Sequence, residues 1–293
     1  MRASSVMDAI GNTPIVQIRS LSTKGSPVLA KLEGMNPSGS VKDRCALGLI
    51  RAAQQRTSLE GRTLIDASSG NLGTAVAMIG ASLGLRVRLL VSNTITNEKR
   101  RSMELLGAEL QFVDGNSLDG AKVAAAMAQE DPRYVFLDQF RNPANVSVHY
   151  ETTGPEILRD VPDVAVYVCA LGSGGSLVGV TRRLREAGLR PSVHAVTAAD
   201  GTRIPGLRNP GEEGGFPPLA DMSLVDEEHR VSIDKALEQI REIARSDGVL
   251  LGLSGGAVLS VAAALARSGN FPGPIVALCG DSSFKYFSKA LAS

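Results

Sequence analysis

Short apolar runs alternate with helix-like segments along almost the whole of this 293-residue chain. The apolar, β-branched runs that we expect to form strands are 14–18, 28–32, 63–65, 87–91, 110–113, 135–137, 164–169, 193–196 and 275–278. The segments expected to be helices are 41–54, 72–83, 97–106, 118–128, 177–187, 233–244 and 257–266. Strands separated by helices pair in parallel, with crossover helices covering both faces of the sheet. The alternation therefore predicts an α/β fold with mostly parallel sheets.

Composition excludes several classes of protein. The chain is 43% hydrophobic and 21% charged, as in ordinary globular proteins. Its net charge of +1 gives no electrostatic basis for binding nucleic acid or an anionic membrane. No apolar run approaches the roughly 18 residues of a membrane span, and residues 1–5 lack the apolar core of a secretion signal. We therefore expect a cytoplasmic protein of about two domains.

The cysteines and histidines follow no catalytic or metal-binding spacing. The cysteines are Cys45, Cys169 and Cys279, and the histidines are His149, His194 and His229. The cysteines form no CxxC pair, so we expect reduced thiols. The histidines form no HExxH pattern, so the sequence predicts no metal centre and no Ser-His-Asp triad.

Lys42 stands at the start of an expected helix, within the stretch Asn-Pro-Ser-Gly-Ser-Val-Lys-Asp-Arg at 36–44. The stretch follows the apolar run 28–32, which places the amine at the end of a strand. Partial burial of a lysine amine lowers its pKa and suits it to form a Schiff base with a cofactor aldehyde. The alternative is a helix N-terminus with ordinary charges.

Three further turns rich in glycine and serine precede expected helices, at 67–73, 171–176 and 252–257. We expect each of them, like the turn before Lys42, to join a strand to a helix. In an open parallel sheet such turns gather at the carboxyl ends of the strands, where ligands bind. The alternative for any one of them is a plain tight turn.

The turns differ in the ligand groups that they suit. The segment 172–176, Gly-Ser-Gly-Gly-Ser, suits a phosphate, because helix-start N–H groups and two hydroxyls would face the anion. It matches neither a P-loop nor GxGxxG, which favours a phosphate carried by another cofactor. The segment 68–71 suits a carboxylate. Ser254 suits a ring nitrogen or a helix cap, and Asp281 is a weaker candidate for the same role.

A reactive lysine, a phosphate site and a carboxylate site together describe a pyridoxal phosphate enzyme that acts on an amino acid. The stretches 11–14, 36–44, 69–73, 138–140, 149–157, 172–176, 254–257 and 285–286 occur in the order typical of one family. On these stretches the chain resembles the cysteine synthase (O-acetylserine sulfhydrylase) family of fold-type-II pyridoxal phosphate enzymes. Segments 204–208 and 223–227 are more similar to the cysteine synthase B branch.

The resemblance implies a role for each matching residue. Lys42 would form the Schiff base and later move the Cα proton. The residues implied in cofactor binding are Lys42, Asn71, Gly172, Ser173, Gly174, Gly175, Ser176 and Ser254. Those implied in holding the substrate carboxylate are Ser68, Ser69, Asn71 and Gln139. The family's fold implies a smaller mobile domain, 35–140, and a larger cofactor-binding domain, 1–34 with 141–293, flanking the cofactor cleft.

The implied reaction is β-replacement on O-acetylserine or O-phosphoserine, through an α-aminoacrylate, giving L-cysteine or S-sulfocysteine. A homodimer and a sulfur-carrier protein are the partners that the family suggests. Leu72 stands where many relatives have threonine, and Gly255 where serine is common, so the nucleophile stays open. The alternatives are another nucleophile, as in 2,3-diaminopropionate synthesis, a serine/threonine dehydratase, and a non-catalytic scaffold.

The segment 201–218 is the candidate for substrate specificity. It is rich in glycine, proline and charge, and long irregular loops are often functional. It carries Arg203 and Arg208, and a guanidinium pairs well with phosphate or a sulfonate-like group. Our hypothesis is that Arg208 admits O-phosphoserine or an anionic sulfur donor such as thiosulfate. The alternative is a solvated loop arginine.

Overall fold

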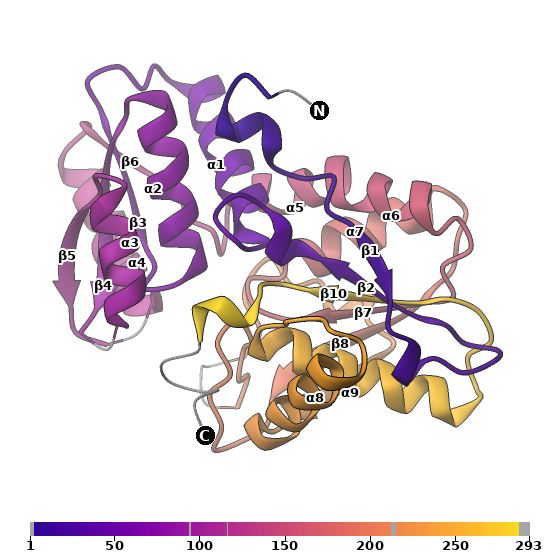
Figure 1. Ribbon diagram of the computed structural model, residues 1–293. Helices are drawn as coiled ribbons and strands as arrows, with labels where there is room; N and C mark the ends of the chain where they lie inside the picture. Colours follow the sequence, from indigo (N-terminus) through magenta and orange to yellow (C-terminus); the bar gives the residue numbers. More distant parts are fainter. Residues whose placement is uncertain (1–2, 94, 116, 212–214, 287–293) are drawn as a thin grey trace. The chain divides into compact units, whose positions relative to one another are not determined.

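The computed structural model describes residues 3–93, 95–115, 117–211 and 215–286 (Figure 1). The chain forms two compact units, each built around its own sheet. The first unit comprises Met1–Ile10, Asn36–Ser38 and Lys42–Asn145, and the second comprises Gly11–Met35, Gly39–Val41 and Val146–Ser293. The predicted α/β class with mostly parallel sheets is confirmed.

The sheet of the first unit is parallel throughout, in the order β5-β4-β3-β6. Its strands are β3 (Thr63–Ala67), β4 (Arg86–Ser92), β5 (Glu109–Val113) and β6 (Tyr134–Phe136), and its helices are α1 (Lys42–Arg56), α2 (Asn71–Leu83), α3 (Asn97–Leu105) and α4 (Ser117–Glu130). Successive strand residues face opposite sides of a sheet. Leu64 therefore packs with α1 and α2, whereas Ile65 packs with α4.

The sheet of the second unit has the order β1-β2-β10-β7-β8-β9, with β1 antiparallel and the other pairs parallel. Its strands are β1 (Ile15–Gln17), β2 (Val28–Leu32), β7 (Val166–Ala170), β8 (Ser192–Ala198), β9 (Glu227–Val231) and β10 (Ile275–Cys279). Its helices are α5 (Ala144–Val148), which begins in the first unit, a π-helix (His149–Thr153), α6 (Gly154–Asp160), α7 (Gly175–Glu186), α8 (Ile233–Ser246) and α9 (Leu253–Ser268). Short 3₁₀ turns occur at Val6–Ala9, Arg19–Leu21, Glu33–Met35, Met222–Leu224 and Ser283–Lys285.

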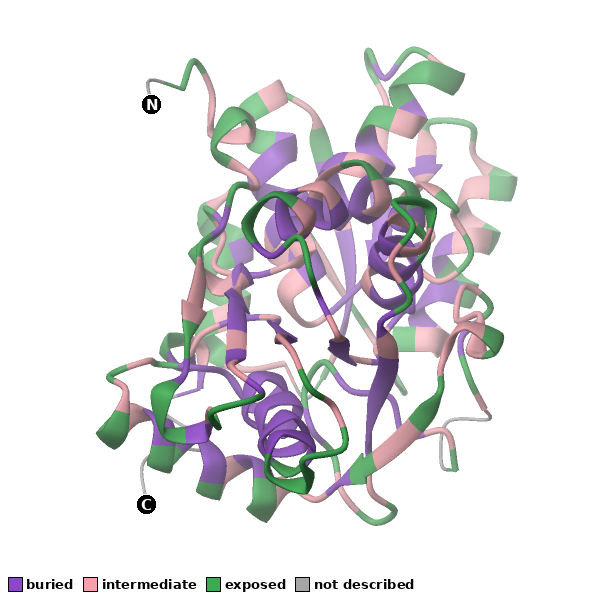
Figure 2. Ribbon diagram, turned by 90° about the vertical axis from the view of Figure 1, so that its right-hand side faces the viewer, coloured by how far each residue is buried: buried purple, intermediate pink, exposed green. Residues whose placement is uncertain are grey.

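Helices cover both faces of this second sheet. Val168 packs in the core cluster formed with α8 and α9, and its neighbour Cys169 packs in the cluster formed with α6 and α7. Figure 2 shows buried residues running along the strands and the inner sides of the helices. No helix within the described ranges is long and apolar enough to cross a membrane.

Three sequence expectations differ from the structure. Strand β9, with the sequence Glu-Glu-His-Arg-Val, was not predicted, because an edge strand lined with charges leaves no apolar run. The short helices between residues 144 and 160 were also missed. The turn at 252–257 follows helix α8 and an irregular segment, so the expectation that a strand precedes it is wrong. It nevertheless opens a helix, α9.

The N-terminal segment lies with the first unit, whereas the sequence placed residues 1–34 in the larger domain. The reason is apolar packing, because Val6, Met7 and Ile10 lie against the core of the first unit. The assignment of one domain as mobile and the other as cofactor-binding stays a prediction.

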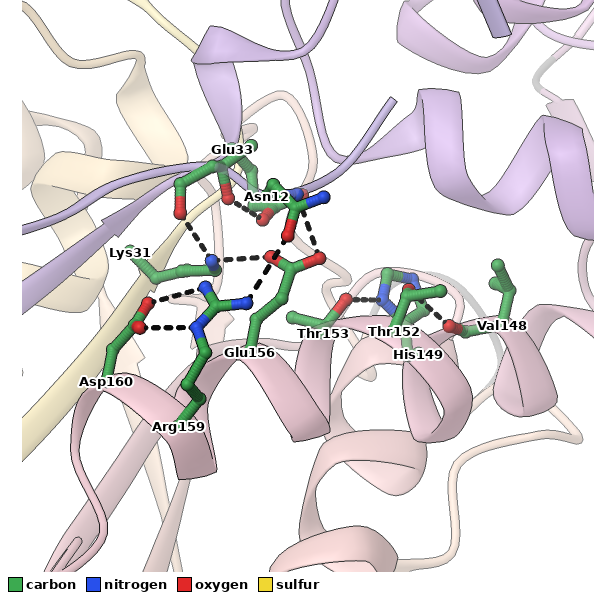
Figure 3. Close-up of polar contacts among 11 residues, drawn as sticks. Asn12, Lys31, Glu33, Val148, His149, Thr152, Thr153, Glu156, Arg159 and Asp160 are labelled. Atoms are coloured by element: carbon green, nitrogen blue, oxygen red, sulfur yellow. Dashed lines mark hydrogen bonds and ion pairs between the residues drawn. The ribbon is translucent and has the colours of Figure 1, made fainter. Parts of the chain in front are cut away.

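A buried ion pair joins β2 to α6 within the second unit (Figure 3). Lys31 Nζ lies 2.7 Å from Glu156 Oε2 and also donates to the carbonyl of Thr13 at 2.5 Å. The other oxygen of Glu156 accepts the backbone N–H of Asn12 at 2.9 Å. These bonds compensate the desolvation of both charges and hold the loop at 11–14.

Candidate active site

Lys42 and Gln139 meet within the first unit. Lys42 is the first residue of α1, and its Nζ donates to Gln139 Oε1 at 3.1 Å. Gln139 follows the carboxyl end of β6 and is buried, and its carbonyl accepts from Asn145 Nδ2 at 2.8 Å. The contact thus connects the proposed nucleophile to one of the residues expected to hold the substrate.

The backbone before Lys42 is held by hydrogen bonds. In the first unit, the backbone N–H of Ser38 donates to the buried Asp43 carboxylate at 2.6 Å, and the Ser38 hydroxyl donates to the same group. In the second unit, the N–H of Val41 donates to the carbonyl of Gly280 at 2.8 Å. Fixing this backbone limits the positions that the amine of Lys42 can reach.

The expected carboxylate turn at 68–71 joins β3 to α2. Gly70 is the N-cap of α2 and has no side chain with which to bond the first N–H groups of that helix. Ser68 Oγ accepts the N–H of Gly70 at 3.3 Å, and Ser69 Oγ accepts the N–H of Ser92 at 2.6 Å. Helix-start N–H groups attract an anion, so this turn is suited to a carboxylate.

Two neighbours of that turn serve packing. Leu72 is buried in the apolar core of the first unit. A Cβ at Gly73 would lie only 2.6 Å from the carbonyl oxygen of Ser68, so glycine is needed for α2 to begin this close to the turn. The Ser-Gly-Asn-Leu-Gly stretch therefore has a packing role beside any binding role.

Asp66 is a site candidate that the sequence reasoning missed. It lies on β3 just before the turn, is buried, and accepts the N–H of Ala67 at 2.7 Å. Burial raises the pKa of Asp66 to about 7, with a further raising effect from Asp138 and a lowering effect from the charge of Lys42. The detectable signal was an acidic residue inside an otherwise apolar strand. Burial also raises the pKa of Cys45 to about 11, which keeps this residue a thiol.

The expected phosphate site lies at the start of α7 in the second unit. Gly174 is its N-cap with φ +91°, and a Cβ there would lie 2.8 Å from the backbone nitrogen of Ala220. A Cβ at Gly172 would lie 2.7 Å from the carbonyl oxygen of Gly206. Ser173 is buried in the same turn. A long helix that begins without a capping side chain directs its first N–H groups outward, as a phosphate requires.

Ser254 lies in the first turn of α9 and is buried. Two glycines lie next to its hydroxyl. A Cβ added to Gly206 would lie 3.6 Å from Ser254 Oγ, and a Cβ added to Gly280 would lie 3.4 Å from the same atom. The weaker candidate, Asp281, accepts a hydrogen bond from the hydroxyl of Tyr286 at 2.5 Å. Ser254 thus has the surroundings expected for a ring-facing hydroxyl, whereas the carboxylate of Asp281 bonds to the protein.

Arg208 is buried, so the alternative of a solvated loop arginine is wrong. Its backbone N–H donates to the carbonyl of Leu171 at 2.7 Å, and its carbonyl accepts the N–H of Ala198 at 2.8 Å. Its Nε donates to the carbonyl of Gly215 at 3.1 Å. Arg208 therefore lies beside the carboxyl ends of β7 and β8, whereas Arg203 is exposed.

The residues of each unit, taken separately, have the chemistry that one part of pyridoxal phosphate requires. The first unit has an amine at a helix start and a turn suited to an anion, and the second has the expected phosphate turn and a buried hydroxyl between glycines. Gly175, Ser176 and Asn71 lie in the first turns of α7 and α2, where the sequence placed them.

A family model described as "Pyridoxal-phosphate dependent enzyme" matches residues 6–281. Cysteine synthase B of Salmonella typhimurium is 38% identical over 291 residues, covering 97% of this chain and 95% of the relative. Cysteine synthase B of Escherichia coli is 37% identical over 289 residues, covering 97% of this chain and 95% of the relative. The chain belongs to the cysteine synthase family. As a member of this family it is a pyridoxal phosphate-dependent enzyme.

Solved structures of the family share the fold along nearly the whole chain. An O-ureido-L-serine synthase matches with a TM-score of 0.92 and 30% identity, covering 99% of this chain and 95% of the other. A hydrogen sulfide-producing enzyme of Fusobacterium nucleatum matches with a TM-score of 0.89 and 32% identity, with 98% coverage of both chains. The cysteine synthase of Entamoeba histolytica matches with a TM-score of 0.91 and 29% identity, covering 99% of this chain and 91% of the other. The family therefore includes enzymes named for different products.

Proposed function

We propose that the enzyme exchanges the acetate of O-acetylserine, or the phosphate of O-phosphoserine, for a sulfur nucleophile. The observation that carries this proposal is the contact of Lys42 Nζ with Gln139 Oε1, which joins the nucleophilic amine to an amide suited to hold an amino acid. The similarity to cysteine synthase B supports sulfide as the nucleophile, which would give L-cysteine. Thiosulfate would give S-sulfocysteine.

The exchange conserves every atom of the reactants. The Cβ–O bond breaks, and the leaving group departs as acetate or phosphate. A Cβ–S bond forms. With hydrogen sulfide one S–H proton passes to solvent, whereas thiosulfate attacks as an anion and releases none. The Cα proton is removed during the first half and restored in the second, so the face on which the proton returns sets the configuration of the product. This division into halves predicts ping-pong kinetics.

The cofactor-binding roles follow from the chemistry of each side chain. Lys42 would carry the cofactor through its Nζ, and the N–H groups and hydroxyls of 172–176 would bind its phosphate. Ser254 would face the ring nitrogen, and Asn71 would bond the 3′-oxygen. Bound pyridoxal phosphate supplies the electron sink that makes the Cα proton acidic. A neutral hydroxyl at Ser254, in place of a carboxylate, would leave the ring nitrogen less protonated and the cofactor less electron-withdrawing. This suits β-elimination better than transamination.

The substrate-binding roles use the first unit. Ser68, Ser69 and Asn71, with the N–H groups that begin α2, would hold the carboxylate together with Gln139. A fixed carboxylate orients the Cα–H bond, and Lys42 Nζ would take and return that proton. The hydrogen bond that Lys42 donates to Gln139 would keep the amine in place between these steps.

The proposal is tested by titrating the visible absorbance of the holoenzyme with O-acetylserine and with O-phosphoserine. Products are then identified with sulfide, thiosulfate and ammonia. We expect a spectral change and a sulfur-containing product that are lost in Lys42→Ala and kept in the exposed-lysine control Lys24→Ala. A preference for ammonia would instead favour diaminopropionate synthesis, and the absence of any product with sulfide or thiosulfate would contradict the proposed sulfur transfer.

For Arg208 we propose a role in choosing the substrate. Its burial next to the phosphate turn supports this, because a buried guanidinium pairs strongly with a phosphate group. Arg208→Ala should lower kcat/KM for O-phosphoserine more than for O-acetylserine, and the exposed-arginine control Arg203→Ala should change neither. An equal loss on both substrates in Arg208→Ala would instead assign the residue to holding its loop through Gly215.

We also propose that the enzyme acts on small-molecule substrates as a cytoplasmic homodimer. A sulfur-carrier protein is a further candidate partner. The family resemblance supports the dimer. Sedimentation of the holoenzyme tests it, and a protein that remains monomeric at assay concentration would contradict it.

A further inference from the structure

Three side chains with metal-binding atoms gather at one edge of the second unit's sheet. His194 lies on β8, and Glu227 and His229 lie on β9, the last strand in the sheet order. The parallel register places His194 opposite Glu227 and Val196 opposite His229. Because residues two apart share a face of a strand, all three side chains project from the same face.

The ligand atoms are close enough to share one ion. His194 Nδ1 lies 2.9 Å from His229 Nε2, and the Glu227 carboxylate lies 3.8 Å from His194 Nδ1 and 3.7 Å from His229 Nδ1. One ligand atom from each residue falls within 4.8 Å of the other two. Tetrahedral zinc with bonds of about 2.0–2.1 Å separates its ligands by about 3.3 Å. Changes of at most about 1.5 Å in these separations would therefore bring one atom of each residue to tetrahedral spacing.

Neighbouring groups orient the buried histidine. Ser192 Oγ lies 3.0 Å from His194 Nε2. The Phe271 ring packs edge-on against the imidazole of His194, with 5.4 Å between the ring centroids. When His194 Nε2–H donates to Ser192, its Nδ1 presents a lone pair to His229 and Glu227. A hydrogen bond from the outer nitrogen to an oxygen is the usual support of a histidine that binds metal.

We propose that His194, Glu227 and His229 form a binding site for a divalent cation of the zinc type. The ion would take the place of the proton that lies between the two imidazoles. His229 would then carry that proton on its Nδ1, so that both histidines bind as neutral imidazoles. Two imidazole nitrogens and one carboxylate oxygen favour zinc over calcium or magnesium, which prefer oxygen ligands alone. Water would fill the fourth position, because Glu227 is exposed and His229 is partly so.

The site is separate from the proposed catalytic residues. His194 lies near the start of β8, whereas Ala198, which bonds the backbone of Arg208, ends that strand. Four strand residues span about 13 Å. A bound ion would therefore cross-link the edge strand β9 to β8 and stabilise the fold without touching the cofactor.

Zinc titration of the tag-free holoenzyme tests the proposal, after treatment with a chelator and its removal by dialysis. We expect the wild type to bind one Zn²⁺ per chain and its Tm to rise with added Zn²⁺. Glu227→Gln and His229→Gln should each weaken binding about tenfold or more, because each removes a ligand. The matched control is Glu228→Gln, the next residue on the opposite face, whose carboxylate accepts from Thr197 Oγ1 at 2.7 Å. It should bind Zn²⁺ like the wild type.

Absence of saturable one-to-one uptake by the wild type would overturn the proposal, as would unchanged affinity in His229→Gln. If His229→Gln does not fold, the exposed Glu227 still allows a decision. Co²⁺ bound in the wild type should give the intense visible bands of tetrahedral coordination, and these should be lost in Glu227→Gln. Unchanged Co²⁺ bands and Zn²⁺ affinity in Glu227→Gln would refute the three-ligand site.

Discussion

Lys42 Nζ donates a hydrogen bond to Gln139 Oε1 at 3.1 Å, which joins the first residue of α1 to the segment after β6. The two residues are 97 positions apart in the chain. β6 pairs with β3, and α1 packs with β3 and α2 in one core cluster, so the sheet and its covering helix bring the two residues together. The contact is the geometric basis of the proposed chemistry.

Replacing Gln139 by leucine removes the acceptor of the Lys42 amine and keeps a side chain of similar size. We expect kcat/KM for the serine ester to fall about 10- to 100-fold, the effect of losing one to two polar contacts. The visible absorbance of the bound cofactor should remain, because Lys42 is intact. The control is Gln54→Leu, at an exposed position on α1, the helix that begins with Lys42. Loss of cofactor from Gln139→Leu would contradict this assignment.

Gly174 and Gly188 offer a matched pair for testing the phosphate turn. Both have positive φ, +91° at the start of α7 and +88° just after its end, so alanine costs about 1–2 kcal/mol of backbone strain at either. A Cβ at Gly174 also meets the backbone of Ala220, whereas one at Gly188 meets nothing within 4 Å. Gly174→Ala should weaken pyridoxal phosphate binding about tenfold or more, measured by equilibrium dialysis. Equal affinity in the two variants would argue against this turn as the phosphate site.

Asp66 should make stability depend on pH. Burial raises the pKa of Asp66 to about 7 in the folded chain, from 3.8 when unfolded, so the folded state holds the proton more tightly. Stability is therefore lost as pH rises from about 4 to about 7. The free energy of unfolding of Asp66→Asn, relative to that of the wild type, should be roughly 3 kcal/mol higher at pH 8 than at pH 5. Urea unfolding at both values measures this, and a pH-independent difference would show that the carboxyl does not titrate as stated.

Lys31→Met should cost about 3–5 kcal/mol of folding free energy, because it leaves the Glu156 carboxylate buried without its cation. Adding Glu156→Gln should recover part of this loss while an oxygen remains for the N–H of Asn12. Lys122→Met breaks the exposed pair with Asp119 and should cost less than about 1 kcal/mol. Denaturant unfolding compares the three variants, and similar costs for Lys31→Met and Lys122→Met would exclude a dominant role for burial.

The sequence predicted the elements whose apolar patterns are strong, such as β2, β10 and α8. It failed at β9, because Glu227, Glu228 and Arg230 replace the apolar pattern of a strand that has only one neighbour. It proposed Lys42, the glycine turns and Ser254 as site candidates from local composition. It missed Asp66, because the expected strand 63–65 ended one residue before it, whereas β3 extends to Ala67 and buries Asp66.

The sequence by itself determined the α/β class, the family and the side chains available for pyridoxal phosphate chemistry, because these depend on local periodicity and short motifs. Only the tertiary structure decided which distant residues meet. Parallel pairing brings Gln139 to Lys42, buries Arg208 beside the turn proposed to bind phosphate, and places His194 against His229. Such contacts follow from strand order and register, which involve residues far apart in the chain and leave no mark in the local pattern.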